Sequence, residues 1–134
     1  MANRLYPKFK EALLKKQVDL IGDVIKVVLI DTADYSYVDT HEFLSSVDEA
    51  ARVGTPQALG TKSVTGGVFD AADVTLPAVV GDQSEALLIY QDTGNPATSR
   101  LIGYFDQANG LPVAPSGADV PITWPNGSSR IFAL

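Results

Sequence analysis

The chain has 134 residues, a length that suits a single domain with its own hydrophobic core. It contains no cysteine, which excludes disulfides and thiolate metal sites, and its single histidine excludes a metal site built from several histidines. The start of the chain holds no long apolar run, and the longest apolar runs elsewhere are far too short to cross a bilayer. Neither a signal peptide nor a membrane-spanning segment is therefore expected.

The net charge of −6 is spread unevenly along the chain. Residues 1–16 carry five basic side chains against Glu11 alone, a net of +4. The other 118 residues carry five basic and fifteen acidic side chains, a net of −10. The basic segment is either a solvated helix face on an acidic domain or an electrostatic docking element for an acidic partner, such as a neighbouring copy's body. Binding to free nucleic acid is not expected, because the acidic body would repel phosphate.

Residues 5–16 are predicted to form a helix. Pro7 is tolerated in a first helical turn. The spacing i, i+4, i+7 and i+8 gives one apolar stripe, formed by Leu5, Phe9, Ala12 and Leu13. Within one domain, residues 1–22 are interpreted as a basic N-terminal helix or arm, and residues 23–134 as a β body.

The next segment, residues 24–30, is rich in β-branched side chains and almost entirely apolar. This composition fits a strand that is buried on both faces. A polar loop over residues 31–40 follows, and Asp39 or Thr40 is placed to cap a short helix through residues 41–44.

The remainder of the chain predicts short strands joined by turns. The strand candidates are residues 58–69, 73–80, 85–91, 100–106, 119–124 and 129–133. Gly66-Gly67 is one of several turn signals, and Asn126-Gly127 is a strong hairpin signal between the last two candidates. No helix-length periodic segment separates the strands, so a parallel α/β fold is not expected. The pattern predicts a mainly β, single-domain antiparallel sandwich or barrel with an N-terminal α-helix.

Residues that could support chemistry are sparse. His41 has no G-x-S-x-G motif to accompany it, so a structural or capping role is expected for it. Calcium would need several converging oxygen ligands. Asp31, Asp34 and Asp39 share a loop without the EF-hand spacing, and aspartates in loops usually form turns or caps. No catalytic residue, metal or cofactor is therefore expected.

Aromatic side chains offer a possible sugar-stacking platform. Trp124 and Tyr90 lie inside strand candidates, where aromatic residues usually fill a core. Tyr35 and Tyr37 lie in a loop and are expected to be more exposed, and Tyr104 completes the set. Core and interface roles are favoured over carbohydrate binding.

Several segments give the chain a recognisable overall pattern: residues 3–14, 25–35, 41–44, 67–75, 85–94, 99–106 and the Asn126-Gly127 turn with residues 130–132. Through these segments, and over essentially its whole length, the chain resembles a family of small structural proteins of tailed bacteriophages. The resemblance implies a capsid decoration (cement) protein first. A tail, neck or fibre-associated virion protein, with carbohydrate binding as an option, is the alternative.

The resemblance also implies a non-enzymatic protein that resides in the virion, assembles in the host cytoplasm and needs no cofactor. Its expected partners are its own copies, as a homotrimer, and the major capsid protein or another virion protein, with neither nucleic acid nor membrane. Many copies on a lattice would gain strength by avidity. The expected contact residues with other copies or the capsid lie in the N-terminal segment and are Arg4, Leu5, Tyr6, Lys8, Phe9 and Leu13.

Overall fold

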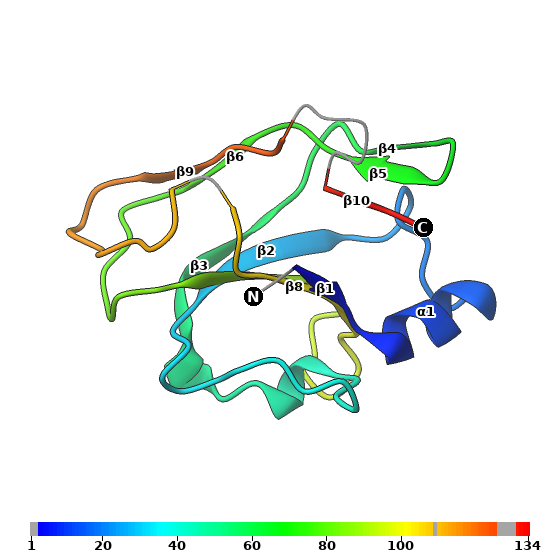
Figure 1. Ribbon diagram of the computed structural model, residues 1–134, viewed down its shortest axis with the longest axis horizontal. Helices are drawn as coiled ribbons and strands as arrows, with labels where there is room; N and C mark the ends of the chain where they lie inside the picture. Colours follow the sequence, from blue (N-terminus) through cyan, green and yellow to red (C-terminus); the bar gives the residue numbers. More distant parts are fainter. Residues whose placement is uncertain (1–2, 109, 126–130) are drawn as a thin grey trace.

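The structure, a computed structural model, describes residues 3–108, 110–125 and 131–134. In this part of the chain, three antiparallel sheets and one N-terminal α-helix form a mainly β fold, as predicted (Figure 1). The sheets do not close into a barrel, so the arrangement is sandwich-like.

The largest sheet has five strands in the order β1-β8-β7-β2-β3, all antiparallel to their neighbours. Its strands are β1 (Arg4–Leu5), β2 (Ile25–Ile30), β3 (Arg52–Ala58), β7 (Ala86–Gln91) and β8 (Leu101–Phe105). Every residue of β7 and β8 is buried, and so is every residue of β2 except Lys26. The prediction of an interior strand over residues 24–30 is confirmed, although Val24 precedes the strand and is half exposed.

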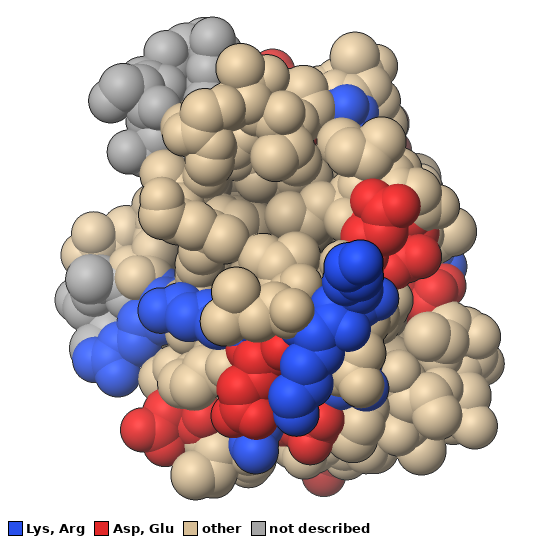
Figure 2. All heavy atoms as spheres, turned by 90° about the vertical axis from the view of Figure 1, so that its right-hand side faces the viewer, with Lys and Arg blue, Asp and Glu red and all other residues tan. Residues whose placement is uncertain are grey.

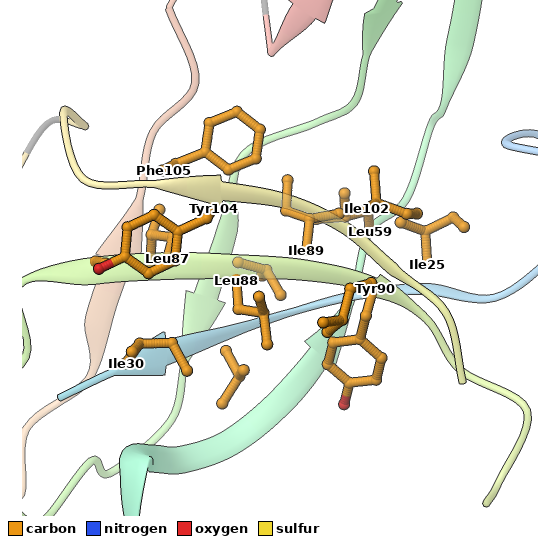
Figure 3. Close-up of a cluster of buried hydrophobic side chains, with 14 of the residues drawn as sticks. Ile25, Ile30, Leu59, Leu87, Leu88, Ile89, Tyr90, Ile102, Tyr104 and Phe105 are labelled. Carbon is orange, nitrogen blue, oxygen red and sulfur yellow. The ribbon is translucent and has the colours of Figure 1, made fainter. Parts of the chain in front are cut away.

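Two smaller sheets form a second layer over one face of the large sheet (Figure 1). One has the order β10-β5-β4 and the other pairs β6 with β9. Their strands are β4 (Ser63–Thr65), β5 (Val68–Asp70), β6 (Val74–Leu76), β9 (Val120–Ile122) and β10 (Phe132–Ala133). Figure 3 shows the rings of Phe105 and Tyr90 on opposite sides of the large sheet. Both faces of its central strands are covered, which explains their unbroken apolar sequence.

The N-terminal segment is built into the same core. Helix α1 spans Pro7–Leu14 and is shorter than the predicted helix over residues 5–16. Arg4–Leu5 is extended instead and pairs with β8 as strand β1. Tyr6 and Phe9 are fully buried, and the Tyr6 N–H donates to the Ile102 carbonyl oxygen at 3.0 Å. The predicted apolar stripe therefore packs against the body.

The turn signals have different outcomes. Gly66-Gly67 divides the candidate strand 58–69, because φ values of 60° and 78° at these two glycines make a two-residue hairpin between β4 and β5. The Asn126-Gly127 turn lies outside the described residues. The strands that flank it do not form the predicted hairpin, because β9 pairs with β6 and β10 pairs with β5.

Residues 41–44 do not form the predicted short helix. The Glu42 carbonyl oxygen accepts the Leu101 N–H, and Phe43 is extended and forms an isolated bridge with Arg100. Two 3-10 turns follow, at Leu44–Ser46 and Glu49–Ala51.

Candidate interaction surface

His41 takes part in a chain of hydrogen bonds with two tyrosines. Its Nδ1 lies 3.1 Å from the Tyr35 hydroxyl, which lies 2.7 Å from the Tyr6 hydroxyl. Burial raises the pKa of both tyrosine hydroxyls above the usual value. Raised pKa values keep both phenols protonated at neutral pH, so their hydroxyls act there as hydrogen-bonding groups of the packed interior.

The aromatic residues considered for sugar stacking are almost all inside the protein. Tyr35, Tyr90, Tyr104 and Trp124 are buried, and Tyr37 is half-buried. The prediction that Tyr35 is exposed is wrong, because its ring packs 6.2 Å from that of Tyr104 and its hydroxyl bonds to Tyr6. These five side chains therefore present no continuous stacking face to solvent.

An acidic cluster forms at the end of β2, with a membership that differs from the one suggested by the sequence. Carboxylate oxygens of Asp31, Asp34 and Asp82 lie within 4.8 Å of one another. Asp39 is not a member; the third carboxylate comes from the loop before β7, which the sequence does not connect to residues 31–40. Asp31 accepts the Ala33 N–H at 2.9 Å, as in an Asx turn. The cluster concentrates negative charge at this end of the molecule.

The predicted contact residues divide into two groups. Tyr6 and Phe9 are buried within the chain's own core and offer no surface to a partner. Arg4, Leu5, Lys8 and Leu13 retain exposure on β1 and α1, so contact by these four stays a prediction. The Arg4 guanidinium lies 5.1 Å from the ring centre of Tyr37, and Lys8 forms an exposed ion pair with Glu11.

An apolar groove of about 540 Å³ lies between the end of α1 and the small sheet β10-β5-β4. Its floor includes the buried side chains Leu20, Phe69 and Phe132. Ile21, Val64 and Leu134 also line it, with 49%, 49% and 65% of their surfaces exposed. Sequence reasoning misses this groove, because its walls come from three segments far apart in the chain.

Charged residues border the groove on the side of α1. Figure 2 faces this side and shows Lys, Arg, Asp and Glu across its lower half and mostly uncharged surface above. Lys16 lines the groove, and Lys10 and Lys15 lie on or just after α1. Among the described residues, none forms an ion pair with these three lysines. Asp19 also lines the groove and accepts the Ile21 N–H at 3.0 Å.

Comparison of the sequence with protein-family models and with curated proteins finds no match. No helix in the described part of the chain is long and apolar enough to cross a membrane.

Proposed function

We propose that this chain is a non-enzymatic structural protein of a tailed-phage virion, where it decorates and stabilises the major capsid lattice. The observation that carries the proposal is the apolar groove beside α1, which Lys16 and Asp19 line. Lys10 and Lys15 lie on or just after the same helix, and none of the three lysines has an ion-pair partner among the described residues. A concave apolar surface with a charged rim is typical of a protein that works in contact with another surface. The whole-chain resemblance to phage structural proteins suggests the kind of assembly.

Weak individual contacts are sufficient for such a role. An exposed ion pair contributes about 0.2–1 kcal/mol, so Lys10, Lys15 and Lys16 would mainly set orientation and association rate. The lasting part of the contact would be apolar and would come from the groove. Copies that contact one another would bind a repeating lattice with the advantage of avidity, so the groove can strengthen capsid binding through contact between neighbouring copies.

The decisive experiment locates the chain in the particle. Virions are purified from the phage whose genome encodes the chain, analysed by mass spectrometry and imaged by cryo-electron microscopy. We expect density for the β fold at regular positions on the capsid surface. Density on the tail, neck or fibres would support the alternative virion role, and absence of the chain from purified particles would contradict both.

A binding assay then tests the surface itself. Particles that lack the chain are titrated with the purified parent protein, with Val64→Glu, which alters the groove, and with Val38→Glu, which alters an exposed valine elsewhere. We expect Val64→Glu to reduce occupancy and Val38→Glu to match the parent. Equal occupancy for all three proteins would remove the groove from the proposal.

A further inference from the structure

We propose that the groove receives the opposite end of a second copy of this chain, so that copies associate head to tail. The inserted element is a tip built from the loop over residues 77–82, whose outermost apolar side chain is Val80. The inference rests on the proposed assembly function and deepens it, because it names the surface that the groove contacts: the acidic end of a neighbouring copy. Loss of the groove would then lower particle occupancy through lost avidity.

The tip exposes an apolar side chain, and hydrogen bonds to a neighbouring loop fix its backbone. Val80 is 68% exposed, whereas the neighbouring Val79 is buried and anchors the loop. The Val79 N–H donates to the Ala118 carbonyl oxygen at 3.1 Å, and the Val79 carbonyl oxygen accepts the Gly117 N–H at 2.8 Å. Asp119 accepts the Ala78 N–H at 2.9 Å. A loop tied down in this way loses little conformational freedom on binding.

The tip carries exposed carboxylates and no exposed lysine or arginine. Asp82 and Asp119 are exposed beside Val80, and Asp82 belongs to the cluster with Asp31 and Asp34. No described basic side chain forms an ion pair with any of these four aspartates. Exposed carboxylates of Asp82 and Asp119 thus lie near an exposed valine at one site. At the other site Lys16 and Asp19 both line the apolar groove, and Lys10 and Lys15 lie on or just after the adjoining helix, so lysines outnumber aspartates on this side. The apolar valine suits the apolar groove, and the excess of lysines over Asp19 beside the groove suits the acidic tip.

The two sites lie at opposite ends of the molecule. In Figure 1, α1 and the β4–β5 hairpin are on the right, and the loops before β7 and β9 are on the left. One copy cannot bring its own tip to its own groove. A contact between two different patches is heterologous, so it repeats from copy to copy and gives a ring if the rotation closes. A second copy therefore fits the groove better than an unrelated apolar partner, because this chain itself supplies the matching surface.

The test measures self-association of the full purified chain, without particles, by sedimentation equilibrium over a range of concentrations. Val64→Glu places a carboxylate in the groove, where it opposes the acidic tip. Val80→Glu replaces the valine proposed to insert with a side chain that carries a carboxylate. We expect the parent to associate and each variant to remain monomeric, with Kd raised at least about tenfold. Val38→Glu is the matched control, because it adds the same charge at an exposed valine outside both sites.

Mixing separates a head-to-tail contact from other modes. The Val64→Glu protein keeps an intact tip and the Val80→Glu protein keeps an intact groove, so an equimolar mixture should form dimers and nothing larger. A far-ultraviolet circular dichroism melt of each variant shows that it is folded. A monomeric parent, full association of either variant, or a mixture that stays monomeric overturns the proposal. None of these results bears on whether the chain occupies particles, so failure here is distinguishable from failure of the decoration role.

Discussion

Two side chains of helix α1 show that the basic segment, residues 1–16, belongs to the core as well as to the surface. Phe9 is 1% exposed and packs edge-on against Phe132, with ring centres 5.8 Å apart. Leu14, on the same helix, is 86% exposed. Of the predicted stripe, Phe9 and Ala12 are buried and Leu13 is half-buried, whereas Leu5 belongs to strand β1 and not to the helix. The pattern does not show that the neighbouring Leu14 is left in solvent.

Phe9→Ala should lower the free energy of unfolding by about 3–5 kcal/mol, because it removes a fully buried aromatic side chain. Urea unfolding followed by circular dichroism measures the change. Leu14→Ala is the control on the same helix and should change stability by no more than about 0.5 kcal/mol. Equal effects of the two substitutions would show that α1 does not pack as described.

The buried tyrosines predict loss of stability at alkaline pH. Burial, with a smaller contribution from nearby Asp92, raises the pKa of Tyr90 to about 12. Burial also raises the pKa of Tyr6 and of Tyr35. Below pH of about 10 the folded and unfolded states both hold these protons, so stability is complete. Above it the unfolded state loses protons first, and each such tyrosine should lower stability by about 1.4 kcal/mol per pH unit until its folded pKa is reached.

Melts between neutral pH and pH of about 12 measure this effect, with tyrosinate absorbance as a second readout. Tyr90→Phe removes one ionising group while keeping the ring, so its stability should fall less steeply above pH of about 10. The same slope in parent and variant would show that Tyr90 ionises equally in both states.

The acidic cluster at the end of β2 can be tested for a bound cation by chelator treatment. Asp31, Asp34 and Asp82 bring three carboxylates together, and we expect no structural cation among them. Chelator should leave the melting temperature unchanged. Asp34→Asn should keep or slightly raise it, because it relieves like-charge repulsion at an exposed position. A chelator-induced fall that calcium reverses and Asp34→Asn reproduces would establish a cation site.

At the scale of elements, strands with a strong local signature are predictable and edge strands are not. The apolar run of β2 predicts its place inside the large sheet. Sequence patterns do not predict β3, because Gly54 and Pro56 interrupt it and its burial does not alternate. The structure accommodates both residues where the β2–β3 register shifts, opposite the stretch between Val27 and Leu29. Proline and glycine are tolerated there, because the strand lies at the sheet edge and its pairing is already irregular.

A charged side chain introduced on either face of β2 should destabilise the fold. Val28 and Leu29 are fully buried and, as neighbours in a strand, point to opposite faces. Val28→Lys and Leu29→Lys should each cost more than about 3 kcal/mol or prevent folding, because an unpaired ammonium is buried. Val64→Lys, at a half-exposed position in β4, is the control and should melt close to the parent. A soluble Val28→Lys protein with an unchanged melt would mean that this face is open to solvent.

At the scale of the whole molecule, the sequence predicts the fold class and the uneven charge but not the surface that they create. Charge is a sum over residues and can be read directly from the chain. The groove requires Leu20, Val64 and Phe132 to meet, and the tip requires the loops at Val79 and Ala118 to bond to each other. These are long-range pairings that no local periodicity encodes. The Asn126-Gly127 signal illustrates the same limit, because its flanking strands find partners elsewhere in the chain.

Removal of residues 1–16 should unfold the protein instead of merely weakening its docking. The deletion takes away strand β1, which forms one edge of the large sheet, and helix α1. It also removes the buried side chains of Tyr6 and Phe9, and it leaves the Tyr35 hydroxyl without its 2.7 Å partner. Cavities of this size and lost strand pairing together exceed the stability of a typical small domain.

The measurement compares this truncated chain with a full-length chain in which Lys8, Lys10, Lys15 and Lys16 are changed to glutamine. We expect the truncated chain to lose its cooperative melt and dispersed amide spectrum. The neutralised chain should keep both, because its four side chains are exposed or half-exposed and pair at most with Glu11. Its association should be slower than that of the parent at low salt and similar at high salt, where surface charges are screened. A truncated chain that melts like the parent would show that residues 1–16 are an appendage rather than part of the core.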